Sequence, residues 1–351
     1  MPIAIERGRV PALLQLAKGL VLAHATSASE APLRIALVNN MPDAALEDTE
    51  LQFFELLSKA AGDLPLTLQF FSLPDLPRAD SGRAHLEKFY FCLDELLRAR
   101  FDGAIITGTE PRRPDLREEP YWPALLELIT WAEENTSSTV LSCLAAHAGV
   151  LAVDGIPRSP LADKQFGVFE HQVMAPHPLT AGLGATMRVP HSRWNEVKAD
   201  ALESRGYEIL TRSPGAGVDL FVKPRRNSLF VHFQGHPEYS ARTLLKEFRR
   251  DIRRYLRQER DTFPTPPQGY FDAEASALLT AFRENAVVAR AQESAGDEDM
   301  FSAFPEAAVA ATIQNTWQPS AATVYRNWLH FLCDKKQATQ SPAPISSAVR
   351  T

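Results

Sequence analysis

Apolar strands alternate with amphipathic helices through the first half of this 351-residue chain, and this alternation constrains the fold most strongly. The strand-like segments are residues 33–42, 66–73, 101–108 and 138–143, and the helical patterns between them are 45–62, 83–100 and 121–136. Near-continuous apolar strands joined by helices are typical of a parallel sheet that is covered on both faces. The pattern therefore predicts an α/β fold whose ligand site lies at the carboxyl ends of the strands.

The second half of the chain predicts shorter strands and then a change of character. Strands are expected at 167–174, 186–192, 207–213, 218–224 and 228–235, and a helix at 241–260. The predicted organisation has five parts: an N-terminal segment packing on the core (1–32), an α/β domain (33–260), a Pro-rich and acidic insertion (261–316), a C-terminal helix (317–336) and a disordered tail (337–351). Within the insertion we expect one helix near 272–292 and a mobile loop at 292–306.

Composition excludes several classes of protein. A hydrophobic content of 45% and a charged content of 23% are those of a globular protein. The net charge of −6 gives no general reason to bind nucleic acid or an anionic membrane. Three scattered cysteines predict neither a disulfide framework nor a metal site, and no signal peptide or membrane span is expected. We therefore expect a cytoplasmic protein.

Cys143 is the candidate nucleophile. The strand 138–143 runs directly into small residues and a helix, which is the pattern of a nucleophile elbow. The helix N-terminus favours a thiolate, and the backbone N–H of Leu144 can stabilise a tetrahedral oxyanion. A buried structural cysteine is the alternative, and it suits Cys92 and Cys333 better because each falls within an amphipathic helical pattern.

The candidate base follows the strand 228–235. Gly235 and Pro237 predict a stiff turn, which leaves His236 and Glu238 at the rim of the sheet. An imidazole beside a carboxylate on a rigid turn is how a general base is oriented, so Cys143, His236 and Glu238 are a candidate triad. His147, one helical turn after Cys143, is a competing base that ordinary helix packing would also explain.

These residues resemble a known family. An elbow cysteine with a distant "GHPEY" is common to class I glutamine amidotransferases and to homoserine O-acyltransferases of the same flavodoxin-like fold. Four further stretches resemble the homoserine O-succinyltransferase family specifically: "NNMPDAALEDTELQFFELLS", "FDGAIITGTEP", "EEPYWPALLELITWAEENTSSTVLSCLAAHAGV", and "DKQFGVFEHQV" with "VPHSRW". The resemblance covers roughly residues 32–255 and resumes at "TWQPSAATVYRNWLHF".

The resemblance implies an acyl transfer from acyl-CoA to L-homoserine in methionine biosynthesis. Cys143 would carry the acyl group as a thioester, His236 would be the base, and Glu238 would orient it. Lys164, Ser192, Arg193 and Arg250 would bind substrate; Arg250 would meet the amino acid's carboxylate, with a one-residue slip to Arg249 left open. No bound cofactor is implied, the partners would be small molecules, and a homodimer is the family expectation.

The loop "TGTEPRRPDL" corresponds to the family's acyl-specificity region. There a glycine accompanies succinyl-CoA and a glutamate accompanies acetyl-CoA, whereas this chain has Arg112, with Glu110 two residues before it. A cation could pair with the free carboxylate of a succinyl group, which favours succinyl slightly; a rotated loop presenting Glu110 would favour acetyl. The elbow also carries Leu144 in place of the family's aromatic residue, and the segment 261–316 is longer than usual.

Three alternatives stay open at this point. The chain could be a glutamine amidotransferase-like amidohydrolase with the same triad, or an acyltransferase of this family that acts on a different amino acid. A non-catalytic regulatory homologue is the third, although the intact triad argues against it.

Overall fold

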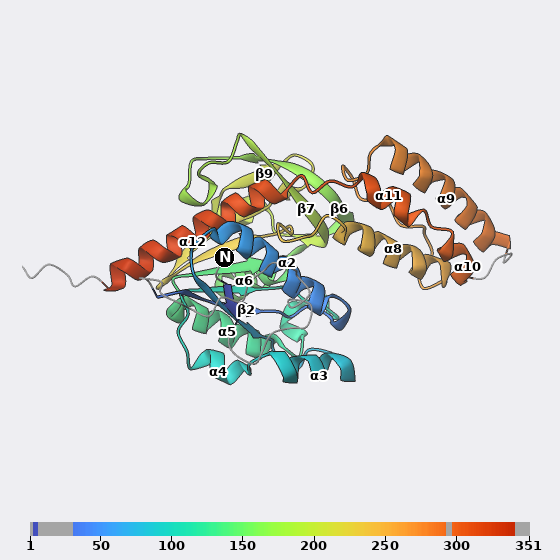
Figure 1. The fold of residues 1–351 in the computed structure, drawn as a ribbon. Helices are drawn as coiled ribbons and strands as arrows, with labels where there is room; N and C mark the ends of the chain where they lie inside the picture. The colour runs from blue at the N-terminus through green and yellow to red at the C-terminus, as the bar shows by residue number, and fades with distance from the viewer. Residues whose placement is uncertain (1–2, 6–30, 293–296, 341–351) are drawn as a thin grey trace, which may run out of the picture.

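A computed structural model describes residues 3–5, 31–292 and 297–340 of the chain. Its centre is an eight-stranded sheet in the order β1-β3-β2-β4-β5-β12-β11-β8 (Figure 1). The strands are β1 (Ile3–Ile5), β3 (Leu66–Phe71), β2 (Leu33–Val38), β4 (Gly103–Ile106), β5 (Ser138–Ser142), β12 (Ser228–Phe233), β11 (Leu220–Arg225) and β8 (Glu208–Ile209). All pairs from β1 to β12 are parallel, and β11 and β8 extend the sheet antiparallel. The predicted α/β fold with a mostly parallel sheet is confirmed.

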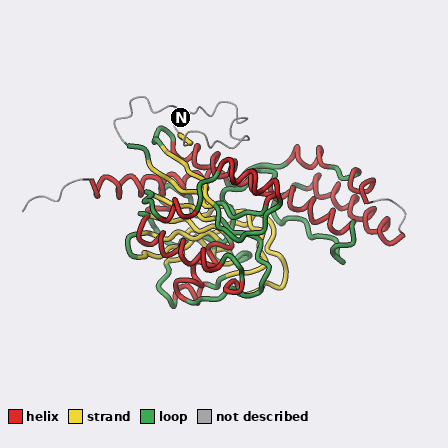
Figure 2. Tube along the Cα trace, turned by 90° about the horizontal axis from the view of Figure 1, so that it is seen from below, coloured by secondary structure: helices red, strands yellow, loops and turns green. Residues whose placement is uncertain are grey.

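Helices cover both faces of this sheet, as the apolar strands require. On one face lie α2 (Asp43–Ala61) and α12 (Gln318–Gln340), with α3 (Asp80–Phe89) beside α2. On the other lie α4 (Leu93–Leu97), α5 (Trp122–Asn135) and α6 (Leu144–Asp154). Figure 2 shows the strands running between these helices. Alternate strand residues divide between the two layers: Ile35 and Ile105 face α2 and α12, whereas Ala36 and Ala104 face α5 and α6.

A second sheet stands beside the carboxyl end of β12. It has four antiparallel strands in the order β10-β9-β6-β7: β10 (Gly217–Val218), β9 (Thr211–Ser213), β6 (Ser159–Val173) and β7 (Thr186–Glu196). The 3-10 turn η2 (Pro178–Thr180) lies between β6 and β7, and α7 (Ala199–Glu203) follows β7. The other 3-10 turn, η1 (Leu116–Glu118), precedes α5 on the main sheet. Gly235 permits the junction, because a Cβ there would lie 2.7 Å from Pro190 O and 2.9 Å from Asp219 Oδ1.

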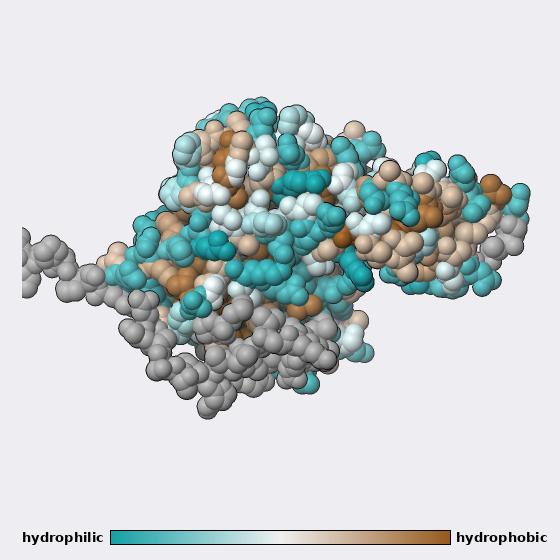
Figure 3. All heavy atoms as spheres, turned by 45° about the horizontal axis from the view of Figure 1, so that its top comes forward, coloured by the Kyte–Doolittle hydropathy of each residue, from teal (hydrophilic) through white to brown (hydrophobic). Residues whose placement is uncertain are grey.

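A helical unit projects to one side of the sheets (Figures 1 and 2). It contains α8 (Thr243–Leu256), α9 (Ala273–Gln292), α10 (Asp297–Ser302) and α11 (Glu306–Thr312) around a separate apolar cluster. Hydrophobic colour gathers over this unit in Figure 3, and Leu278, Val287 and Val288 are exposed there.

Several predicted elements need correction. The helix expected at 83–100 is two helices, because Phe91 N donates to Phe70 O (2.9 Å) beside β3 and Cys92 then caps α4. Cys92 is consequently exposed rather than buried, while Cys333 is half-buried. The loop expected at 292–306 contains α10, and buried Phe304 anchors the residues after it.

The two ends of the described chain add a strand to the sheet and length to the last helix. Within 1–32, the described residues 3–5 form the edge strand β1 against β3. The last helix continues to Gln340, so the first residues of the predicted tail 337–351 are helical, and residues 341–351 lie outside the described ranges. In the part of the chain that the structure describes, no helix has the length and apolar character needed to span a membrane.

The contact between α12 and the sheet yields a test of the packing. A Cβ on Gly103 would lie 2.7 Å from Leu332 Cδ1 and 2.8 Å from Trp328 Cζ2. We expect Gly103→Ala to lower the free energy of unfolding by about 1–3 kcal/mol because the buried helix must shift. Urea unfolding is the measurement, with Gly184→Ala as the control, since its nearest neighbour would lie 4.0 Å away. Equal effects of the two substitutions would contradict the described packing.

Candidate active site

Cys143 occupies the sharp turn between β5 and α6. Its backbone has φ 53° and ψ −112°, a conformation that residues other than glycine rarely adopt. The turn is fixed by Cys143 N, which donates to Phe233 O of β12 at 2.8 Å. The thiol is only half-buried, so the predicted elbow geometry is present.

The amides after Cys143 can stabilise negative charge. Leu144 is the first residue of α6, so its N–H lies outside the intrahelical hydrogen bonds. Gly108, at the end of β4, approaches so closely that a Cβ there would lie 2.9 Å from Leu144 N. The predicted oxyanion position is therefore bounded by two strand ends.

His236 and Glu238 form the second part of the site. Since β12 pairs parallel with β5, the turn after β12 lies next to Cys143. His236 N donates to Pro190 O (2.8 Å), and His236 Nδ1 donates to Glu238 Oε1 (2.8 Å). The Tyr239 ring stacks on the imidazole with 4.2 Å between centroids. The imidazole is thus held from two sides.

Electrostatics favour a protonated His236. Burial alone would lower its pKa. The negative charges of Cys143 and Glu238, and hydrogen bonds to both, raise it by more, so the pKa of His236 lies well above 6.5. An imidazolium beside a thiolate is the resting arrangement of an activated cysteine.

The competing candidate, His147, is bonded to another strand end and is a weak base. His147 is 2% exposed, and its Nε2 lies 2.9 Å from Gln234 Oε1. Burial and the charge of Arg193 lower its pKa to about 3. His147 is a neutral packing residue of α6.

A cluster of charged side chains gathers three of the predicted substrate residues. Lys164 Nζ lies 3.3 Å from Glu247 Oε2 and 3.5 Å from Asp251 Oδ2. Ser192 Oγ donates to Glu247 Oε2, and Arg250 Nε and Nη2 each lie 3.3 Å from Asp251 Oδ1. The cluster therefore joins β6, β7 and α8 in one place.

Glu247 is the residue that sequence reasoning missed. Besides Ser192 and Lys164 it accepts the Tyr239 hydroxyl at 2.8 Å, and Tyr239 stacks on His236. It therefore links the predicted substrate residues to the predicted base. Its position one helical turn before Arg250 and Asp251 was the available signal, but nothing in the sequence alone indicates that it faces Lys164 and Ser192.

The two neighbouring arginines point to different places. Arg250 lies by Asp251, and the charges of Glu247 and Glu110 also raise its pKa. Arg249 instead pairs with Glu306 and lies over the Phe301 ring, 5.1 Å from its centroid. Of the two arginines, only Arg250 belongs to the charged cluster with Glu247 and Asp251.

Arg193 and Arg112 lie apart from that cluster. Arg193 is 4% exposed, and its guanidinium donates to Asn195 O (2.8 Å), Ala216 O (2.6 Å) and His191 Nδ1 (3.2 Å). This geometry supports a structural role. The side chain of Arg112 is exposed, whereas its backbone N–H donates to buried Glu119.

Within the described residues, no group of three or more His, Cys, Asp or Glu side chains is arranged to hold a metal ion.

The pKa of His236 gives a direct test of the triad electrostatics. Replacing Glu238 with Gln removes a negative charge, so we expect the pKa of His236 to fall. NMR titration of the histidine ring signals measures this. His147, whose pKa of about 3 depends on burial first, is the internal control and should stay neutral throughout. An unchanged His236 pKa would contradict the described charge coupling.

Comparisons with known proteins place the chain. The sequence model of the family "Homoserine O-succinyltransferase" matches residues 2–339. A relative from Methylorubrum extorquens named "Homoserine O-succinyltransferase" is 45% identical over 303 residues, 86% of this chain and 88% of the relative. Relatives of the same name from Rhodopseudomonas palustris and Bradyrhizobium japonicum are each 43% identical, over 86% of this chain and 89% and 90% of their own lengths.

Two solved structures also match in part. A glutamine amidotransferase from Methylobacillus flagellatus has a TM-score of 0.45 at 14% identity, covering 86% of this chain and 94% of that one. One from Thermotoga maritima has a TM-score of 0.43 at 10% identity, covering 86% and 99%. From the family match and the relatives' identities, the chain belongs to the homoserine O-succinyltransferase family, which confirms the predicted family and the predicted enzyme class of homoserine O-acyltransferase.

Proposed function

We propose that this enzyme transfers an acyl group from acyl-CoA to the hydroxyl of L-homoserine through a thioester on Cys143, with succinyl as the favoured group. The observation that carries the proposal is the contact of His236 with both Cys143 and Glu238 at adjacent strand ends. The reaction would belong to methionine biosynthesis, as the relatives' activity name suggests.

In the first step, the Cys143 thiolate attacks the carbonyl carbon of acyl-CoA. Leu144 N–H stabilises the oxyanion, and the departing CoA sulfur takes the proton of His236. In the second step, neutral His236 takes the proton of the homoserine hydroxyl as its oxygen attacks the thioester. Cys143 leaves as the thiolate, so the imidazolium–thiolate pair is restored.

The charged cluster supplies recognition of the amino acid. Arg250 is 52% exposed at its side chain and can present its guanidinium to a carboxylate. Glu247 and Asp251 provide acceptors for the ammonium group of the substrate. In this structure the ammonium group of Lys164 lies next to both carboxylates. Tyr239, between Glu247 and His236, connects this subsite to the base.

Other parts of the proposal follow from the family. The enzyme would act in the cytoplasm on small molecules without a bound cofactor, and it would form a homodimer. The exposed apolar residues Leu278 and Val288 of α9 offer one face for such an association.

Initial-rate kinetics test the proposal. Release of free CoA from succinyl-CoA should require homoserine for turnover, and parallel lines in double-reciprocal plots should indicate a ping-pong mechanism. Faster turnover with acetyl-CoA would reverse the preferred donor. Hydrolysis of glutamine, with no reaction of either acyl-CoA, would replace the proposal with the amidohydrolase alternative.

The adjacent arginines provide a matched pair of variants. We expect Arg250→Gln to raise KM for homoserine by about 10- to 100-fold, because a charge-assisted hydrogen bond to the carboxylate is lost. Arg249→Gln should leave this KM within about twofold, since its partner is Glu306 in the helical unit. The reverse ranking would show that the amino acid binds elsewhere.

A further inference from the structure

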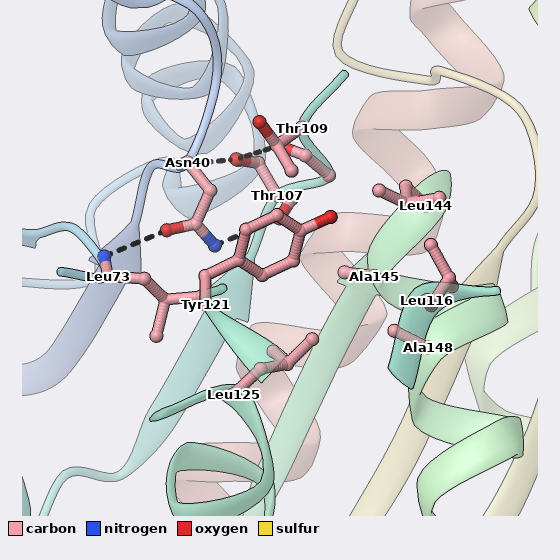
Figure 4. Close-up of a pocket in the computed structure, with 11 residues that line it drawn as sticks. Asn40, Leu73, Thr107, Thr109, Leu116, Tyr121, Leu125, Leu144, Ala145 and Ala148 are labelled. Atoms are coloured by element: carbon pink, nitrogen blue, oxygen red, sulfur yellow. Dashed lines mark hydrogen bonds between the residues drawn. The ribbon is translucent and has the colours of Figure 1, made fainter. Parts of the chain in front are cut away.

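A buried hydroxyl beside the candidate nucleophile lacks a hydrogen-bond partner. Tyr121 is 3% exposed, and its Oη has no partner in the described ranges. With Thr109, Leu144 and Ala145 it lines a cavity of about 10 Å³, the space of one water. Figure 4 shows the hydroxyl directed toward Leu144. Buried hydroxyls normally find a partner, so this one is available to a ligand atom that enters beside Cys143.

A half-buried cation lies by the same loop. Arg158 follows α6, and its Nη2 donates to Arg113 O (3.3 Å) and Pro114 O (3.1 Å). No carboxylate of the described residues lies within 4.0 Å of its guanidinium. Burial lowers the pKa of Arg158, and the charges of Tyr121, Glu119 and Cys143 offset this only in part. The guanidinium is thus held against residues 113–114, and the backbone N–H of Arg113 donates to Glu119, two residues before Tyr121.

Glu119 does not neutralise this cation by direct pairing. Its Oε1 accepts the backbone N–H groups of Arg112 and Arg113, the latter at 2.6 Å. This buried carboxylate fixes the loop over Arg158 and leaves the other guanidinium donors of Arg158 for a ligand. The loop's own arginines, Arg112 and Arg113, are exposed.

We propose that Arg158 and Tyr121 bind the free carboxylate of a succinyl group carried on Cys143, and so determine the acyl specificity. Arginine offers several donors to a carboxylate, and the Tyr121 hydroxyl adds a neutral donor. An acetyl group has nothing to place there. The long pantetheine arm keeps the CoA phosphates away from the thiol, which argues against a phosphate site. The inference rests on the proposed thioester chemistry.

The test is the single-turnover acylation of Cys143 by succinyl-CoA and by acetyl-CoA, followed by intact-protein mass. Arg158→Gln should slow succinylation by about 10- to 100-fold and acetylation by less than about twofold. Tyr121→Phe should slow succinylation by about 3- to 10-fold. Arg158→Lys retains the charge and should recover part of the succinylation rate. Arg117→Gln is the control from the same loop, because Arg117 pairs with Asp115 at the surface.

The outcomes separate a failure of the carboxylate site from a failure of the proposed thioester chemistry. Equal slowing with both donors would mean that Arg158 only supports the loop or the CoA moiety, and no slowing would mean that it does not meet the acyl group; either overturns the inference. A wild-type protein acylated by acetyl-CoA alone would overturn the carboxylate site and leave the thioester chemistry standing. Acylation by neither donor would instead refute the proposed function itself.

Discussion

The parallel pairing of β5 with β12 is the contact on which the rest of the site depends. It places the ends of two strands side by side, with Cys143 N bonded to Phe233 O across them. Cys143 therefore lies at the N-terminus of α6. His236 lies on a turn that is fixed by its hydrogen bond to Pro190 of the second sheet. The positive φ of Cys143 is tolerated because both neighbouring strands are buried in the core.

From this junction the site extends outward in two directions. On one side, Tyr239 and Glu247 join the imidazole to the cluster of Lys164, Ser192 and Arg250. On the other side, Gly108 and Tyr121 bound the space beside Leu144. In the proposed reaction, the first half would bind the amino acid near α8 and the second half would bind the acyl donor near the loop after β4.

The sequence predicted the parts of this arrangement that depend on local pattern. Apolar strands and the small residues around Cys143 indicated the sheet and the elbow, and the stiff Gly235–Pro237 turn indicated the base. Long-range contacts were not predictable in the same way. Whether Arg249 or Arg250 faces the site depends on how α8 packs against α10 and α11. The acceptors of the Arg193 guanidinium, which are His191 and Asn195 of its own strand and Ala216 of another segment, were likewise not predictable from local pattern. The break at Phe91 likewise results from pairing with β3.

The central claim is that Cys143 carries the acyl group, activated by His236. Its most direct test is peptide mapping after a rapid quench of the protein mixed with succinyl-CoA in the absence of any acceptor. The account predicts one succinyl group on the peptide that contains Cys143, its absence in Cys143→Ala, and its discharge when homoserine is added. A succinyl group on another residue, or product formation by Cys143→Ala at the wild-type rate, would contradict the account.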